Sequence, residues 1–274
     1  QESRGLGDVY KRQVSWETVS MDPESVRFRG RFARRGIYLL PNLLTSAALF
    51  AGFYAIVMAM NGRFEHAAVG IFVAMLLDGL DGRVARLTRT QSAFGAEYDS
   101  LSDMVAFGVA PALVMYSFAL KGLGKLGWIA AFVYCVGAAL RLARFNTLLD
   151  VQDRRWFQGL PSPSAAALVA GLVWVAHDYR LSGEELAWFA WGLTLFAGIT
   201  MVTNLRFYSG KDINLRKSVP FAVVVLIALS FVLIALDPPL VLFSLFLVYA
   251  LSGYGVSLHL WRKTRSRKGL SETP

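Results

Sequence analysis

Residues 76–103 read LLDGLDGRVARLTRTQSAFGAEYDSLSD and place four aspartates in an otherwise apolar part of the chain. Asp78 and Asp81 are three positions apart, and Asp99 and Asp103 are four positions apart. Residues at these spacings lie on one face of a helix, so the stretch predicts an acidic pair on each of two helices. Carboxylates held this close repel one another and resist burial, and a bound divalent cation is the simplest remedy.

The composition around this stretch is typical of a membrane protein. Of the 274 residues, 55% are hydrophobic and 17% are charged, whereas soluble domains carry about a quarter charged residues. Several apolar segments approach the roughly 20 residues that a bilayer crossing requires. They cover residues 38–60, 64–86, 96–120, 127–148, 163–179, 185–205, 219–236 and 239–260. The expected fold class is therefore all-α, a polytopic integral membrane protein with about eight transmembrane helices.

Basic residues are distributed unequally between the two sets of loops that this topology creates. One set, together with the C-terminal tail, holds Arg83, Arg86, Arg89, Arg141, Arg144, Arg154, Arg155, Arg206, Lys211, Arg216, Lys217, Arg262, Lys263, Arg265, Arg267 and Lys268. The other set holds Arg63, Lys121, Lys125 and Arg180. By the positive-inside rule, both termini and the acidic stretch face the cytoplasm. The net charge of +9 then reports cytoplasmic loops and contact with anionic lipids, and we expect no nucleic-acid partner.

Other site chemistries find little support in the sequence. The single cysteine, Cys135, forms no intramolecular disulfide, the three histidines lack zinc-like spacing, and there is no GxxxxGK[ST] loop. Carboxylates suit Mg²⁺ or Mn²⁺, which also bind substrate phosphates. Two alternative uses of intramembrane acids stay open at this point. They are ion pairs with neighbouring arginines and a cation path in a transporter, although a path would place acids along several spans.

The four aspartates belong to a longer pattern, DxxDGxxARx₈GxxxDxxxD, whose every fixed position is present between Asp78 and Asp103. On this pattern the chain resembles the CDP-alcohol phosphotransferase family. The resemblance implies an enzyme that transfers a phosphoryl-bearing group from a CDP-linked donor to an alcohol hydroxyl and releases CMP. It also implies two divalent cations, Mg²⁺ or Mn²⁺, bound by the aspartates.

The resemblance assigns a role to each signature residue. Asp78, Asp81, Asp99 and Asp103 resemble the family's metal ligands, and Asp103 also resembles its general base. The small residues Gly82, Ala85 and Gly95 would leave room for the nucleotide and its diphosphate, and Arg86 would pair with phosphate. Asp78 also belongs to this nucleotide-binding set. Upstream, Asn42 and Thr45 fit either contact with the nucleotide or helix capping.

Sequences flanking the signature point to one group of family members. PNLLT (residues 41–45), ALRLARFN (139–146) and FQGLPSPSAAA (157–167) resemble members that use CDP-diacylglycerol and L-serine to form phosphatidylserine and CMP. Arg141 and Arg144 would then contact a phosphate or the serine carboxylate, although snorkelling to the interface would also explain an arginine here. Glycerol 3-phosphate, an inositol phosphate or choline stay open as alternative acceptors.

The expected organisation has three regions. Residues 1–36 form a basic cytoplasmic segment, residues 37–260 the transmembrane catalytic domain and residues 261–274 a basic cytoplasmic tail. Because residues 1–20 lack a signal-peptide core and the first methionine is Met21, we expect the native chain to start there. The resemblance further implies a homodimer in the inner membrane of a bacterium, in contact with membrane lipids and with its active site facing the cytoplasm.

Overall fold

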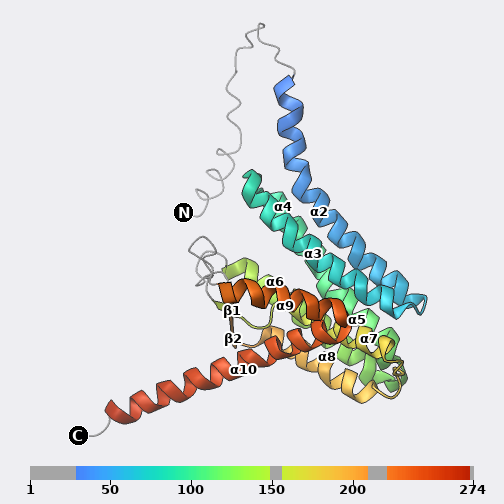
Figure 1. The fold of residues 1–274 in the computed structure, drawn as a ribbon, viewed down its shortest axis with the longest axis vertical. Coiled ribbons are helices and arrows are strands. Elements are labelled where there is room, and N and C mark those ends of the chain that lie inside the picture. The colour runs from blue at the N-terminus through green and yellow to red at the C-terminus, as the bar shows by residue number, and fades with distance from the viewer. Residues whose placement is uncertain (1–28, 149–155, 209–220, 272–274) are drawn as a thin grey trace, which may run out of the picture. The chain divides into compact units, whose positions relative to one another are not determined.

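The computed structural model describes residues 29–148, 156–208 and 221–271 (Figure 1). By its internal contacts the chain divides into residues 1–37 and residues 38–274, and the acidic stretch lies in the second of these units. The expectations for residues 1–28, including a native start at Met21, lie outside the described residues.

The described chain is almost entirely helical, and each segment expected to be apolar coincides with a helix or with consecutive helices. The elements are α2 (Arg29–Met60), α3 (Phe64–Thr88), α4 (Ala93–Asp103), the π-helix η1 (Met104–Val109), α5 (Ala110–Met115), the π-helix η2 (Tyr116–Leu120), the short 3₁₀ helix η3 (Lys121–Leu123), α6 (Lys125–Leu148), α7 (Ser162–Asp178), α8 (Ala187–Val202), α9 (Phe221–Leu236) and α10 (Pro238–Ser271). The all-α class is thus confirmed, with the small exception of one two-stranded ribbon. The helix α10 continues beyond residue 260, where the sequence predicts the end of the last span.

Membrane crossing is supported for part of this set. Within the described residues, four helical stretches are long and apolar enough to cross a bilayer: Leu40–Met60, Ala93–Leu123, Lys125–Thr147 and Pro238–Leu258. The helices α7, α8 and α9 have 17, 16 and 16 residues, fewer than the roughly 20 that a full crossing needs. The helix α3 is long enough, but the acids and arginines of the quoted stretch occupy its C-terminal half. The protein is therefore a membrane protein by its apolar helices, and the count of eight spans stays a prediction.

Helix α7 lies at the centre of the second unit. It packs against α3, α5, α8 and α10, and its side chains are buried around most of its circumference. A helix that is apolar on all sides is stable only where neighbours cover it. The run of alanines at residues 165–167 lets those neighbours approach closely, as small residues do in membrane bundles. Because α7 contacts α3 directly, it supports the helix that carries Asp78.

Two short strands join the loops on either side of α7 and α8. The strand β1 (Trp156–Gln158) pairs antiparallel with β2 (Arg206–Tyr208). Phe207 on β2 is fully buried and packs against α10 so closely that a Cβ at Gly253 would overlap its ring. The hydroxyl of Tyr249 on α10 donates to the carbonyl of Tyr208. Strands of three residues carry no recognisable alternation of polar and apolar residues, which is why the sequence did not predict this ribbon.

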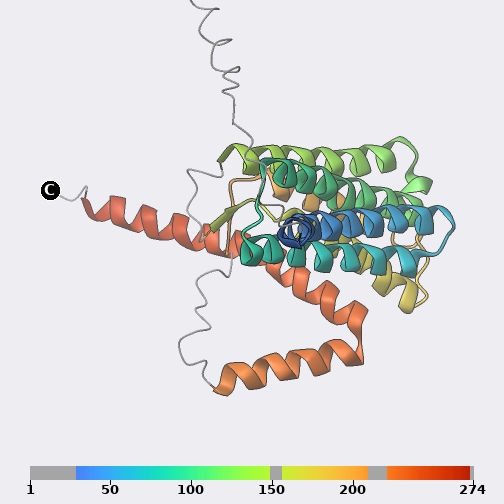
Figure 2. The same ribbon diagram turned by 90° about the horizontal axis from the view of Figure 1, so that it is seen from above.

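The last two helices form a hairpin (Figure 2). Only Asp237 separates α9 from α10. Its carboxylate accepts a hydrogen bond from the backbone N–H of Leu240, so Asp237 caps α10 in the manner of an N-cap residue. Pro238 opens the helix, a position that proline tolerates because the first N–H groups of a helix have no intrahelical partner. The two consecutive prolines, Pro238 and Pro239, thus mark the tight turn between α9 and α10.

Helices α6 and α8 cross at a pair of glycines, which generates a prediction. A Cβ at Gly137 would overlap the carbonyl oxygen of Gly198, and one at Gly198 would lie 2.8 Å from the Cα of Tyr134. Backbone atoms cannot move aside cheaply, so overpacking at about 1–3 kcal/mol outweighs the gain of about 1 kcal/mol in helix propensity from Gly to Ala. We expect Gly137→Ala to lower the melting temperature of the purified protein in detergent by several degrees.

The matched control is Gly192→Ala, on α8, where an added Cβ meets nothing within 4 Å. This variant should keep or slightly raise the melting temperature, because only helix propensity changes. Equal melting temperatures for the two variants would contradict the close crossing of α6 and α8.

Candidate active site

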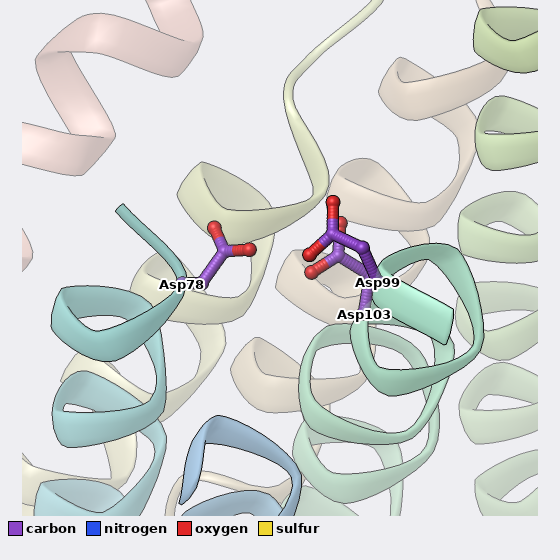
Figure 3. A group of neighbouring side chains, drawn as sticks. All are labelled: Asp78, Asp99 and Asp103. Atoms are coloured by element: carbon purple, nitrogen blue, oxygen red, sulfur yellow. The ribbon is translucent and has the colours of Figure 1, made fainter. Parts of the chain in front are cut away.

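Three of the four signature aspartates meet between α3 and α4. Asp78 projects from α3, and Asp99 and Asp103 project from α4 toward it (Figure 3). One carboxylate oxygen from each residue lies within 4.8 Å of those of the other two. The four-residue spacing of Asp99 and Asp103 thus puts both on one helix face, as the sequence predicts.

Asp81 stands apart from this cluster, although it comes from the same signature. Its side chain is 4% exposed, and its carboxylate accepts a hydrogen bond of 2.7 Å from the hydroxyl of Thr45 on α2. Asp81 is still close enough to Asp78 and Asp99 to repel both electrostatically. The structure therefore gathers three carboxylates at one point and holds the fourth beside them through α2. That all four bind metal stays a prediction.

The donor set of the cluster fits a hard divalent cation. All of its ligand atoms are carboxylate oxygens, the type that Mg²⁺ and Mn²⁺ prefer. The Oδ1 atom of Asp99 is buried and has no hydrogen-bond partner among the described residues. A buried carboxylate oxygen without a partner is costly, and a cation at this position would satisfy it. The aspartate cluster can therefore hold a metal ion.

A cavity of about 380 Å³ adjoins the cluster and is lined by most of the residues predicted to bind the nucleotide. Its predicted lining residues are Asn42, Thr45, Asp81, Gly82, Ala85, Arg86, Gly95 and Asp99. Of the predicted nucleotide set only Asp78 is missing from the wall. Because Asp99 belongs both to the wall and to the cluster, a molecule in the cavity would reach the carboxylates.

The cavity also has lining residues that the sequence did not predict, namely Pro41, Thr90, Gln91, Ser92 and Ala96. Most of them belong to the eight-residue spacer of the signature or lie next to its Gly95. The fixed length of the spacer was the one feature of the sequence that could have indicated these lining residues, because a turn between two helices that share a site must itself border that site.

The turn between α3 and α4 is built by local interactions that fix this spacer. Helix α3 ends at Thr88, and its C-cap residue Arg89 adopts the left-handed conformation with φ 54°. Helix α4 starts at Ala93, and its N-cap residue is Ser92, whose hydroxyl accepts a hydrogen bond from the backbone N–H of Gly95. A Cβ at Gly95 would lie 3.1 Å from the Ser92 hydroxyl and 3.3 Å from Oδ1 of Asn42. Glycine at this position thus allows α2 and the start of α4 to approach closely.

The two arginines predicted near the acceptor lie on α6 and do not line this cavity. Arg141 donates a hydrogen bond of 2.5 Å from Nη1 to the Ser162 hydroxyl, and it interacts electrostatically with Asp78 and Asp103. Arg144 donates to the side-chain oxygen of Asn204 at 3.1 Å. Both arginines border a small hollow. Within the acidic cluster, Asp99 therefore borders the cavity, whereas Asp78 and Asp103 interact with Arg141.

Asp103 occupies a junction between two kinds of helix. It is the last residue of α4, and the π-helix η1 begins at the next residue. A π-turn leaves a carbonyl displaced from the regular ladder, and here the fully buried Tyr134 donates a hydrogen bond of 3.0 Å to the carbonyl of Phe107. Such turns are frequent at functional sites, and this one fixes the backbone that follows Asp103.

Three carboxylates that can hold a cation, beside a cavity in a helical membrane protein, are the arrangement expected of a metal-dependent membrane enzyme. Comparison with known proteins defines the family within that class. Residues 38–199 match the family model described as CDP-alcohol phosphatidyltransferase. The chain belongs to this family, as the signature predicts. Members of the family use divalent metals, in agreement with the all-oxygen donor set of the cluster.

Three proteins similar to this chain carry the same name. The chain is 38% identical over 217 residues to the CDP-diacylglycerol–serine O-phosphatidyltransferase of Helicobacter pylori, covering 78% of this chain and 90% of that protein. It is 32% identical over 248 residues to the Mycobacterium bovis protein of the same name, covering 88% and 84%. The similarity extends to an archaeal protein of that name from Methanocaldococcus jannaschii, 34% identical over 176 residues, covering 64% and 77%.

The cluster geometry predicts which acids hold the cation. We expect purified wild-type protein to bind Mn²⁺, and Asp78→Asn, Asp99→Asn and Asp103→Asn each to weaken binding by about tenfold or more, since even residues that only support metal ligands contribute about tenfold. Electron paramagnetic resonance of free Mn²⁺ measures this directly and without turnover.

Glu97→Gln serves as the control, because Glu97 is an exposed acid on the same helix α4. It should leave Mn²⁺ affinity unchanged. If Glu97→Gln weakens binding as much as the aspartate variants do, general surface charge and not the cluster attracts the ion.

Proposed function

We propose that the protein transfers the phosphatidyl group of CDP-diacylglycerol to the hydroxyl of L-serine, forming phosphatidylserine and releasing CMP. The observation that carries this proposal is the cavity whose wall includes residues of the signature and shares Asp99 with the aspartate cluster. The common name of the similar proteins supports the donor and the acceptor. The chain belongs to the CDP-alcohol phosphatidyltransferase family, and no observation on the described residues separately favours the alternative of a cation transporter.

The cavity is the proposed site of the CDP group. Gly82, Ala85 and Gly95 contribute little side-chain volume to its wall, which leaves space for the ribose and base. Arg86 is the cavity's cationic lining residue and can pair with the diphosphate, to which arginine binds through paired N–H groups. The acyl chains of the donor would remain among the apolar helices.

The aspartates Asp78, Asp99 and Asp103 would hold the divalent cation, with Asp81 as the proposed fourth ligand when two cations bind. When bound, such cations neutralise the diphosphate and stabilise the charge that develops on the leaving oxygen. Either Mg²⁺ or Mn²⁺ is compatible with this site, because carboxylates bind both ions.

Asp103 is the proposed general base. It would accept the proton of the serine hydroxyl while the serine oxygen forms a bond to the phosphorus that carries diacylglycerol. The bond from that phosphorus to the bridging oxygen breaks, and CMP departs with the electron pair. Among the cluster residues, Asp103 and Asp78 interact with Arg141, which supports an acceptor on their side and a donor at Asp99 in the cavity wall.

Transfer in one displacement is the simplest mechanism for these residues. A covalent intermediate needs a nucleophile activated by a neighbouring base. The hydroxyl of Ser102, next to Asp103 in the sequence, donates instead to the carbonyl of Thr45 at 3.1 Å. Ser102 is therefore engaged in packing α4 against α2.

Arg141 and Arg144 are the proposed contacts for the acceptor's anionic group. Their positive charge suits the carboxylate of serine, and it would also suit a phosphorylated alcohol such as glycerol 3-phosphate or an inositol phosphate. Choline has no anionic group to match them. The flanking motifs and the similar proteins favour serine among these acceptors.

The proposed setting is the inner membrane of a bacterium, with the active site and both termini in the cytoplasm. The excess of arginine and lysine in the loops next to the signature supports this orientation. A homodimer is proposed from the family resemblance alone.

The acceptor assay tests the function. Purified protein is supplied with CDP-diacylglycerol and a divalent cation and offered serine, glycerol 3-phosphate, inositol or choline. We expect CMP release with serine to exceed release with each other acceptor by at least about tenfold, because a site that pairs a substrate's polar group discriminates strongly against analogues that leave it unpaired. Preference for another acceptor would overturn the serine assignment and leave the family intact.

The proposed base generates a separate prediction. Asp103→Asn keeps the shape of the side chain and removes its ability to accept a proton. We expect CMP release to fall by about 100-fold or more, in line with the usual contribution of a general base, while CDP-diacylglycerol still binds. Rapid quench measures the first and equilibrium binding the second.

Glu97→Gln is again the matched control and should retain wild-type turnover. Turnover at the wild-type rate in Asp103→Asn would remove Asp103 from the role of base.

A further inference from the structure

Ser162 is a buried polar residue that the proposed function has not used. It is the first residue of α7 and is fully buried. Its hydroxyl oxygen accepts the hydrogen bond of 2.5 Å from Nη1 of Arg141. Among the described residues, Ser162 is the hydrogen-bond partner of the Arg141 guanidinium. This contact joins two elements, α6 and α7, at the edge of the acidic cluster.

The backbone around Ser162 is held rigidly. Pro161 and Pro163 flank it, and proline fixes φ near −65°. Gly159 and Leu160, just before Pro161, are tied to the end of α8 and the segment after it, since Leu160 donates to the carbonyl of Thr200 and Gly159 to that of Leu205. The Ser162 oxygen is therefore a fixed point to which a long, flexible arginine side chain can be attached.

The chemistry of this contact matters because serine is neutral. A carboxylate in place of Ser162 would pair with the guanidinium and neutralise it. The hydroxyl orients Arg141 and leaves its positive charge available. The charge then acts on whatever lies next to Asp78 and Asp103, the two acids with which Arg141 interacts. A site arranged in this way suits an anionic group that arrives with the substrate.

We propose that Ser162 is a positioning residue that fixes Arg141 for the carboxylate of the amino-acid acceptor. The proposal rests on the assignment of Arg141 to the acceptor in the proposed function. Ser162 does not touch the substrate itself. It limits the rotamers of Arg141, so that little conformational entropy is lost when the acceptor binds. Ser162 thereby contributes to the affinity for serine and not to the affinity for CDP-diacylglycerol.

The test separates the two substrates kinetically. We expect Ser162→Ala to raise the KM for serine by about tenfold, the order expected for a hydrogen bond to a charged group. The kcat and the KM for CDP-diacylglycerol should change less than about twofold on that same scale. Ser162→Cys replaces the hydroxyl by a slightly larger thiol that is a weak acceptor, and it should also raise the KM for serine. Thr194→Val removes a buried hydroxyl that donates within its own helix and should leave both KM values unchanged.

A double-mutant comparison distinguishes the positioning role of Ser162 from the assignment of Arg141 to the acceptor, on which it rests. If Arg141→Lys raises the KM for serine, the acceptor assignment of Arg141 holds, and adding Ser162→Ala should then cause little further loss. An unchanged KM for serine in Ser162→Ala and Ser162→Cys, with a raised KM in Arg141→Lys, overturns the positioning role alone. An unchanged KM for serine in Arg141→Lys overturns the acceptor assignment itself. Equal losses for both substrates in Ser162→Ala would indicate general damage to the fold and also overturn the proposal.

Discussion

The structure depends on one electrostatic constraint, the repulsion among three carboxylates that α3 and α4 bring together. Three oxygens within 4.8 Å of one another would repel by about 3 kcal/mol per ionised pair at an effective dielectric constant of about 20. Removal from water adds a further cost for each charge. Bound protons or cations relieve this repulsion, and the groups that surround the cluster determine where such positive charge can bind.

The neighbouring residues meet this constraint in different ways. Thr45 donates to Asp81 and thereby holds the fourth acid away from the other three. Arg141 supplies a fixed cation near Asp78 and Asp103. The Asp99 oxygen that has no hydrogen-bond partner in the described part of the chain is available to a ligand from outside the protein. These contacts do not neutralise all the carboxylates of the cluster. The remaining negative charge favours binding of a divalent cation.

The signature could be predicted from the sequence because helical geometry converts spacing into direction. A step of four residues turns a helix by about 40°, whereas a step of three turns it by about 60° in the opposite sense. Asp99 and Asp103 accordingly point the same way, and the cavity wall formed by Gly82, Ala85 and Arg86 follows from the same periodicity. Asp78 and Asp81 are three positions apart and diverge more in direction, so the hydrogen bond from Thr45 on α2 determines where Asp81 points. Contacts such as those of Arg141 with Ser162 and of Arg144 with Asn204 join residues far apart in the chain, and no local pattern indicates them. The number of membrane crossings was still harder to predict from the sequence, because α7 is short and is stabilised by the neighbours that bury it and not by its length.

The division of charge around the cluster bears on the direction of the reaction. In a single displacement the attacking and the leaving oxygens lie on opposite sides of the phosphorus. Arg86 lines the cavity together with Asp99, whereas Arg141 is absent from that wall and interacts with Asp78 and Asp103. One arginine is thus available for the leaving diphosphate and the other for the incoming acceptor, with the carboxylates between them. The base expected to take the acceptor's proton belongs to the pair on the side of Arg141, which is the side from which attack must come if CMP leaves into the cavity.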